Sequence, residues 1–403
     1  MTASSAVDIS TSTDAASMLL PKTEAGRLRL VMGITCDQTC LVLRGRLSAL
    51  RKAGFEVTLV SAPGESLTRL AAEEEVTACP LPMQRGISPL RDLISLIALC
   101  RLLRRLRPAI TDFSTPKAGL LGNLAAWLMG VPHRVYTLRG LKLESSKGWR
   151  RWLLLWAERV SARCAHVVLC NSESLFQAAN ALGIAAKGKL RLLGDGSSNG
   201  VDTERFSPGT SEVRREYGIG ADEMVVGFVG RLTRDKGIPE LLVAFEEIVR
   251  VEPRCRLLLV GWFDRSEDAL EPRWRAWIQE HPRICHTDFV RDTAPYYRAM
   301  DLLVLPTRRE GFPNVALEAA ACGLAVITTE STGARDAVLP EVTGLLIPAG
   351  VPEAISEAVL SLLKDAGRRK RMGAAGRPWV LERYTRERVL GLAVEFYRGL
   401  LVR

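Results

Sequence analysis

The sequence predicts an α/β protein built from two facing Rossmann-like domains, each with a parallel sheet, and with an interdomain cleft. Short apolar runs alternate with helical stretches along nearly the whole chain. The runs are continuously apolar rather than alternating, which is typical of strands covered by helices on both faces. A chain of 403 residues also exceeds what one ordinary hydrophobic core organises, so we expect two domains.

Twelve apolar runs predict the strands. In the first half of the chain they are 28–34, 56–61, 109–113, 134–139, 167–172 and 190–193. In the second half they are 224–230, 255–261, 284–289, 301–306, 325–329 and 344–348. The stretches between them, such as 40–54 and 90–107, carry the spacing of helices. This alternation predicts βαβ units throughout.

A segment rich in Gly, Ser and Pro, 194–212, separates the two series of strands and predicts a domain boundary with a hinge. We expect a first domain over 26–205 and a second over 206–380. The amphipathic end, 381–403, predicts a helix that packs back towards the first domain. The beginning, 1–25, is rich in Ser, Thr and Ala and predicts a disordered leader.

The formal net charge of +10 is concentrated in one part of the chain. Residues 101–170 contain 13 Lys or Arg against 3 Asp or Glu, which equals the whole excess. Such a patch indicates a phosphate-bearing lipid, an anionic membrane surface or nucleic acid as partner, or else a solvated helix face without one.

Nine cysteines without a C-x-x-C pair indicate buried, reduced thiols in a cytosolic protein. No apolar run is long enough to cross a membrane, and the start lacks the order of a secretion signal. We therefore expect a cytoplasmic protein, with peripheral attachment to the inner face of the plasma membrane as the alternative.

The first chemical motif is GRLTRDKG, 230–237, which follows an apolar strand. Arg231 and Lys236 stand five residues apart, and a helical stretch begins directly after them. Two cations at the carboxyl end of a strand and beside a helix N-terminus suit a diphosphate. A departing nucleoside diphosphate gains negative charge in the transition state, which these cations would stabilise. Exposed turn charges are the alternative.

The second motif is EGFPNVALE, 310–318, which follows the strand predicted at 301–306. Glu310 lies in the loop, Pro313 marks the beginning of a helix, and Glu318 lies about one turn inside it. Free backbone N–H groups at 312–315 can donate to sugar hydroxyls or phosphate oxygens. Two carboxylates at this spacing are weak evidence alone, and the loop and helix around them make the motif strong.

These two motifs, in this order and spacing, resemble the family 4 retaining glycosyltransferases with the GT-B fold. The segments STPKAGLLGNLAAWLMGVP, YTLRGLKLE and GDGSSNGVDTERF resemble the branch that assembles capsular polysaccharide and exopolysaccharide. The similarity extends from about residue 28 to the C-terminus. It implies an acceptor-binding first domain and a second domain that binds a nucleotide sugar.

The resemblance implies roles for particular residues. Arg231 and Lys236 hold the donor diphosphate, and Glu318 accepts hydrogen bonds from the ribose hydroxyls. The backbone around Val290 and Arg291 contacts the base. The donor sugar is surrounded by Glu310, Gly311, Phe312, Pro313 (through its carbonyl), Asn314 and Val315.

The family typically works with retention and without a metal or other cofactor, and this chain has no D-x-D triplet to hold Mg²⁺. Arg231, Lys236 and helix N-termini would then meet the charge on the leaving group. Since no carboxylate nucleophile is obvious, a front-face route is favoured. Many relatives have histidines where Asp112 and Ser114 stand here, so Asp112 is a catalytic candidate on the acceptor side.

On the acceptor side, the basic segment predicts a site for a polyprenyl-diphosphate-linked sugar. Its candidate residues are Lys117, Gly119, Arg139 and Lys142. The stretch 147–163 combines three tryptophans with several arginines, which suits an interfacial helix on anionic lipid. An ordinary helix packed on its own sheet is the alternative.

The leading hypothesis is thus a retaining hexosyltransferase for surface polysaccharide with a UDP-sugar donor. A nucleotide-sugar epimerase of the same fold would need its own acid and base at the sugar ring. A non-catalytic protein that binds anionic membrane through 101–170 would tolerate replacement of Arg231, Lys236, Glu310 and Glu318. Nucleic acid is not expected as a partner, because no recognition module accompanies the charge.

Overall fold

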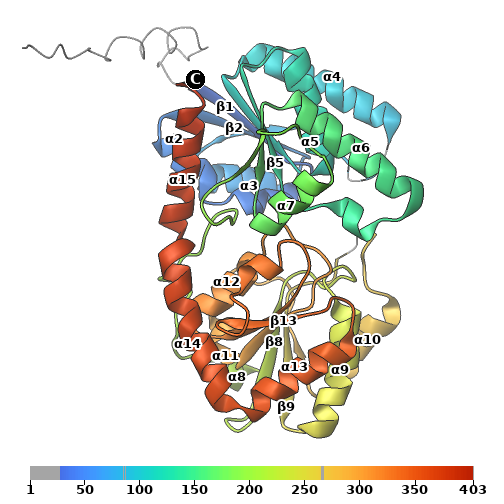
Figure 1. Ribbon diagram of the computed structural model, residues 1–403, viewed down its shortest axis with the longest axis vertical. Coiled ribbons are helices and arrows are strands. Elements are labelled where there is room, and N and C mark those ends of the chain that lie inside the picture. The colour runs from blue at the N-terminus through green and yellow to red at the C-terminus, as the bar shows by residue number, and fades with distance from the viewer. Residues whose placement is uncertain (1–27, 85, 87, 265–266, 403) are drawn as a thin grey trace, which may run out of the picture.

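The structure is a computed structural model that describes residues 28–84, 86, 88–264 and 267–402. The predicted leader, 1–25, lies outside the described residues. The chain folds into two α/β units stacked along the longest axis of the molecule (Figure 1). Each unit has one parallel sheet with helices on both faces, so the predicted fold class is confirmed.

The first sheet has seven parallel strands in the order β3-β2-β1-β4-β5-β6-β7. The strands are β1 (Leu28–Gly33), β2 (Phe55–Ser61), β3 (Thr77–Pro80), β4 (Ile110–Ser114), β5 (His133–Leu138), β6 (Val167–Cys170) and β7 (Leu190–Leu192). The central strand β4 is buried along its whole length. The sequence did not predict β3, because this short edge strand has no buried residue and no apolar run marks it.

Helices cover both faces of the first sheet (Figure 1). They are η1 (Asp37–Leu43), α2 (Arg46–Lys52), α3 (Glu65–Glu73), α4 (Pro89–Leu106), α5 (Pro116–Leu128), η2 (Lys142–Ser145), α6 (Gly148–Cys164) and α7 (Glu173–Ala181). Helix α5 packs between α4 and α6. A Cβ atom at Gly122 would overlap the ring of Phe113, so glycine allows α5 to approach the sheet closely.

The second sheet has six parallel strands in the order β10-β9-β8-β11-β12-β13. The strands are β8 (Met224–Val229), β9 (Cys255–Val260), β10 (Ile284–His286), β11 (Leu302–Leu305), β12 (Ala325–Thr329) and β13 (Gly344–Ile347). All six were predicted from their apolar runs. The helices are α8 (Val213–Glu216), α9 (Ile238–Val251), α10 (Pro272–Glu280), α11 (Ala294–Ala299), α12 (Asn314–Ala321), η3 (Arg335–Ala337) and α13 (Pro352–Lys364).

The strand order places the two chemical motifs side by side. In the second sheet the order reverses between β8 and β11, which are hydrogen-bonded neighbours. Loops that follow such a pair leave the sheet at the same edge and open a crevice for ligands. The loop with Arg231 follows β8, and the loop with Glu310 follows β11.

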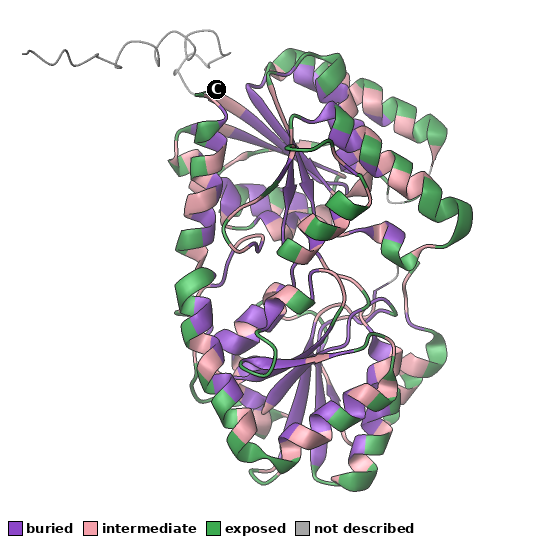
Figure 2. Ribbon diagram, in the orientation of Figure 1, coloured by how far each residue is buried: buried purple, intermediate pink, exposed green. Residues whose placement is uncertain are grey.

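Two crossings join the units. The chain ends in two helices, α14 (Ala366–Arg383) and α15 (Arg386–Gly399). The connection between β7 and α8 pairs with the turn between these helices. There the N–H of Val201 donates to the carbonyl of Tyr384 (2.8 Å), and the N–H of Arg386 donates to the carbonyl of Val201 (2.9 Å). Helix α14 packs on α12 of the second unit, whereas α15 packs on α2 of the first. Tyr397 of α15 lies within the core of the first unit. Figure 2 shows buried positions along the inner side of both helices.

All nine cysteines lie within the described residues and none forms a disulfide. No helix in the described part of the chain combines the length and the apolar character that a membrane crossing requires.

Candidate active site

The loop after β8 carries Arg231 and Lys236, and two glycines shape it. Gly237 ends the loop with a positive φ of 73°, and a Cβ atom there would overlap the carbonyl oxygen of Pro306. Gly261, after β9, has a φ of 147° and lies against the carbonyl of Gly230. Because only glycine fits such contacts, the loop is held between the ends of β9 and β11. Helix α9 begins directly after it.

Lys236 and Glu310 form an ion pair across the ends of β8 and β11. Both side chains are largely buried, at 17% and 16% exposure. The backbone N–H of Glu310 also donates to the carbonyl oxygen of Thr332 (3.0 Å). The structure therefore brings together the second cation of the first motif and the first carboxylate of the second motif.

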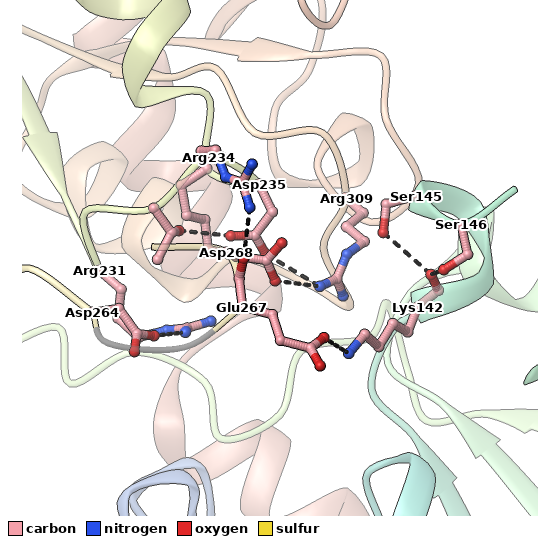
Figure 3. A network of polar contacts seen from close by, with 12 residues as sticks. Lys142, Ser145, Ser146, Arg231, Arg234, Asp235, Asp264, Glu267, Asp268 and Arg309 are labelled. Atoms are coloured by element: carbon pink, nitrogen blue, oxygen red, sulfur yellow. Dashed lines mark hydrogen bonds and ion pairs between the residues drawn. The ribbon is translucent and has the colours of Figure 1, made fainter. Parts of the chain in front are cut away.

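Arg231 pairs with Asp264, which lies beyond the end of β9 (Figure 3). The sequence did not single out Asp264, which is 33 residues from Arg231 and has no motif of its own. The signal that could have found it is the strand order, because β9 neighbours β8 and its loop must leave at the same edge.

Asp235 of the same loop contacts Thr233 (2.6 Å) and Arg309 (3.2 Å). Burial alone would raise the pKa of Asp235. The hydrogen bond from Thr233 and the charges of Lys236 and Arg309 outweigh burial, so its pKa lies below the usual range. The environment at the ends of β8 and β11 thus favours negative charge. Arg309, which the sequence did not single out, directly precedes Glu310 in the same loop.

Glu318 lies on α12 and accepts a hydrogen bond from the hydroxyl of Tyr297 (2.9 Å). Tyr297 is fully buried on α11, with the edge of its ring against Phe206. Burial raises the pKa of Glu318, and the bond from Tyr297 and the charge of Arg205 oppose that effect. Tyr297 was also missed, because the contact depends on how α11 packs on α12.

The predicted base-contact loop lies near Glu318. Arg205, whose charge acts on Glu318, donates to the carbonyl oxygen of Arg291 (2.9 Å) and pairs with Asp292 (2.8 Å). Val290 is half-buried and packs on the core of the second unit. Arg291 is exposed and lines a cavity of about 200 Å³ between the units, with Leu41, Arg44, Arg69, Glu73 and Phe289.

The Gly-Phe-Pro segment contacts the first unit at Gly311 and the core of the second unit at Phe312. A Cβ atom at Gly311 would lie 2.5 Å from the carbonyl oxygen of Arg139, so the two backbones touch here. Phe312 is buried, with its ring 5.4 Å from that of Tyr384.

Pro313, Asn314 and Val315 begin α12. Pro313, which the sequence predicts to mark the beginning of a helix, is the N-cap residue, and the helix itself starts at Asn314. The side-chain oxygen of Asn314 accepts a hydrogen bond from Ser197 of the connection (2.9 Å), and Val315 is half-buried against the core. Asn314 is thus engaged with the protein in this state.

Asp112 at the end of β4 is buried and already bonded. Thr137 donates to both carboxylate oxygens (2.8 and 2.9 Å), and the hydroxyl of Tyr397 donates to one of them. Asp112 therefore joins β4, β5 and α15 in this structure.

The four acceptor-side candidates separate into two pairs. Lys117 forms an ion pair with Asp92 of α4 (2.6 Å), and Gly119 lies against the ring of Tyr136 inside the first unit. Arg139 and Lys142 instead lie at the contact between the units.

The guanidinium of Arg139 donates to the hydroxyl of Ser198 (3.0 Å). Burial, and then the charge of Arg46, lower the pKa of Arg139 to about 10. Lys142 reaches Glu267 of the second unit (3.4 Å), as Figure 3 shows. Among the described residues, no three His, Cys, Asp or Glu side chains are grouped so as to hold a metal ion.

Two family models match the chain. The model "Glycosyl transferase 4-like domain" matches residues 42–196, and "Glycosyl transferases group 1" matches 223–365. The interval between the two matches, 197–222, contains most of the connection between β7 and α8, and α8 itself.

Two curated relatives and one solved structure are similar over most of the chain. The capsular polysaccharide biosynthesis glycosyltransferase CapM of Staphylococcus aureus is 35% identical over 87% of this chain and 92% of its own. The UDP-Gal:alpha-D-GlcNAc-diphosphoundecaprenol alpha-1,3-galactosyltransferase of Escherichia coli is 28% identical, over 77% and 81%. HepE of Anabaena, solved in complex with UDP and glucose, is 17% identical and covers 93% of this chain and 100% of its own, with a TM-score of 0.77.

Proposed function

This chain belongs to the family of group 1 glycosyltransferases with a glycosyltransferase 4-like domain, and we propose that its donor is a nucleoside-diphosphate sugar. The proposed acceptor is a lipid-linked or saccharide chain in the assembly of a surface polysaccharide. The observation that carries the proposal is the convergence of Arg231, Lys236 and Glu310 at the neighbouring ends of β8 and β11.

The proposed chemistry follows from the charges. The diphosphate of the donor would take over the cations that now pair with carboxylates, Lys236 from Glu310 and Arg231 from Asp264. Charge that develops on the leaving diphosphate is then met by two positioned cations in a largely buried site. Release from Lys236 would leave the carboxylate of Glu310 free to orient the sugar. No metal or other cofactor enters the proposal.

The remaining assignments extend the same site. Glu318, held by Tyr297, would accept the ribose hydroxyls, and the backbone near Val290 and Arg291 would contact the base. We propose retention at the anomeric carbon by a front-face route, in which the leaving phosphate helps to deprotonate the acceptor. NMR assignment of the product's anomeric configuration tests this route, and an inverted product would contradict it.

A UDP-sugar is the proposed donor and a polyprenyl-diphosphate-linked sugar the proposed acceptor. The printed name of the Escherichia coli relative contains UDP-Gal and a diphosphoundecaprenol acceptor, and HepE was solved with UDP and glucose. A polyprenyl tail confines its acceptor to a membrane. We therefore propose peripheral attachment to the inner face of the membrane, with the segment 147–163 in contact with anionic lipid.

An epimerase is disfavoured, because CapM, which matches most of this chain, is a glycosyltransferase.

A thermal-shift screen of nucleotides and nucleotide sugars tests the donor site. A ligand that binds the folded state raises the melting temperature by mass action. We expect a shift with uridine compounds that is lost in Lys236→Ala, because a missing phosphate contact of this kind weakens binding by about tenfold or more. Lys364→Ala is the matched control, since it removes an exposed lysine from the same unit. An equal shift in Lys236→Ala and the wild type would contradict the donor-site assignment.

A further inference from the structure

Helix α4 presents apolar side chains to solvent. Leu90, Leu93, Ile94 and Ile97 are between 43% and 79% exposed. Their spacing of i, i+3, i+4 and i+7 places them on one face of the helix. The opposite face, with Leu99 and its neighbours, is buried in the first unit. The exposed apolar residues therefore do not serve to pack the helix on the sheet, because the opposite face does that.

Helix α6 repeats this arrangement with larger side chains. Trp149 and Trp152 are each 68% exposed and Trp156 is 51% exposed. They also follow one face, at i, i+3 and i+7. Three indole rings exposed on a single stripe are unusual for a surface that faces only water.

The two stripes point the same way along the molecule. Helices α4, α5 and α6 each follow one strand of the parallel sheet and precede the next, so they run in the same direction, with α5 between the other two. The exposed apolar residues of α4 lie in its amino-terminal half, together with the exposed Arg91, and further arginines follow them. On α6 the exposed Arg150 and Arg151 lie between Trp149 and Trp152, and further arginines follow Trp156. Figure 1 shows α4, α5 and α6 together on one side of the first unit, and Figure 2 shows exposed positions along α4 and α6.

The carboxyl-terminal halves of α4 and α6 expose arginines and no carboxylate. On α4 the exposed side chains after Ile97 include Arg101, Arg104 and Arg105. On α6 those after Trp156 are Arg159 and Arg163.

The two carboxylates of these helices both have partners within the protein. Asp92 of α4 pairs with Lys117, and Glu158 of α6 is buried and bonded to Tyr136. The surface is therefore apolar and uniformly cationic.

We propose that this face, made of α4 and α6, docks on an anionic lipid bilayer. The leucine, isoleucine and tryptophan side chains would enter the boundary of the acyl chains, and the arginines would contact lipid phosphates. A second copy of the chain would bring two sets of arginines together, and a nucleic acid would leave the apolar stripes unpaired. The inference rests on the proposed function in one respect, because a lipid-linked acceptor would bring the enzyme to a membrane. It adds α4 to the segment 147–163 that the sequence predicted to contact lipid.

Co-sedimentation with vesicles tests the proposal on the full chain, without donor or acceptor. The vesicles are phosphatidylcholine alone, or the same lipid with about one part in three of phosphatidylglycerol. We expect binding to the anionic vesicles with a blue shift of tryptophan emission. Leu93→Gln with Ile94→Gln should weaken binding by about tenfold or more, because two apolar side chains no longer enter the lipid. Arg104→Gln with Arg105→Gln should weaken it too, and should lessen its salt dependence.

The matched control is Val342→Gln with Leu381→Gln, two exposed apolar residues of the second unit and its following helix. It should bind vesicles as the wild type does. Equal binding by the α4 variant, or no binding by the wild type, would overturn the proposal. A wild-type dimer in size exclusion that the α4 variant converts to monomer would replace the bilayer with a second copy as the occupant. Vesicle binding without a thermal shift by uridine compounds would contradict the donor site and support the membrane face, so the two proposals can be told apart.

Discussion

At the scale of single residues, three cations of the candidate donor site are paired with carboxylates in the part of the chain that the structure describes. Lys236 contacts Glu310, Arg231 contacts Asp264, and Arg309 lies between Asp235 and Asp268. A bound diphosphate must compete with these carboxylates for the same N–H groups. The pairs also keep the cations in place before the donor arrives, so less side-chain entropy is lost when it binds.

Tyr297 offers a test of the ribose contact. Replacement by Phe removes the O–H that donates to Glu318 and keeps the buried ring. One such hydrogen bond contributes about 0.5–1.5 kcal/mol. We therefore expect UDP to bind Tyr297→Phe about threefold to tenfold more weakly, as measured by titration calorimetry.

Tyr397→Phe is the matched control for this measurement. Tyr397 is also fully buried and also donates to a carboxylate, that of Asp112 in the first unit. Both variants should lose some stability, because each loses a buried hydrogen bond. Only Tyr297→Phe should lose UDP affinity, and an equal loss in both would indicate a general effect on the fold.

At the scale of elements, the sequence predicted every strand among the described residues except β3, and it predicted both chemical loops. Those predictions succeeded because an apolar run, or two cations directly after one, is a local signal. The contacts of Asp264 and Tyr297 could not be predicted in the same way. They depend on which strands are neighbours and on how α11 packs against α12, and no short stretch of sequence records either.

The connection 194–212 shows a different limit of sequence reasoning. Its Gly, Ser and Pro content predicts a boundary and a hinge, and it lies between the two sheets. Ser198 nevertheless receives hydrogen bonds from Arg139 and Asn171 (3.0 and 2.9 Å), and Ser197 bonds to Asn314. Composition shows that a segment lacks a core of its own, but it does not show what the segment packs against.

The attachment of α6 to the first sheet predicts a pH dependence. Glu158 of α6 is buried and accepts a hydrogen bond from Tyr136 of β5. Burial raises the pKa of Glu158 to about 7, against the opposing effect of that bond. The folded state thus holds this proton more tightly than the unfolded chain, so the stability from this group is complete at low pH. It is lost as the pH rises from about 4.5 towards about 7.

Glu158→Gln removes this titration and keeps a side chain that can accept the bond. The unfolding free energy of the variant minus that of the wild type should be larger at about pH 8 than at about pH 5, by about 1–3 kcal/mol. Urea unfolding at both pH values measures the difference. The exposed Glu280→Gln serves as the control and should follow the wild type. The same difference between Glu158→Gln and the wild type at both pH values would contradict the prediction.

At the scale of the whole molecule, the two units contact each other beside the candidate site. The hydroxyl of Ser174 on α7 donates a hydrogen bond to Asp336 and accepts one from the backbone N–H of Gly333 (2.7 Å). The hydroxyl of Thr332 donates to the carboxylate of Glu144 in η2 (2.7 Å). Together with the contact between Gly311 and Arg139, these bonds bring the carboxyl ends of the two sheets together. Neither unit alone contains both the donor loops and the basic face of α4 and α6.

The central claim is that Arg231, Lys236 and the two carboxylates Glu310 and Glu318 bind one nucleoside diphosphate. A crystal structure of the complex with UDP tests this claim most directly. The account predicts a diphosphate that contacts Arg231 and Lys236, with the ribose hydroxyls on Glu318. A diphosphate bound elsewhere, with the pairs of Lys236 with Glu310 and Arg231 with Asp264 intact, would contradict it.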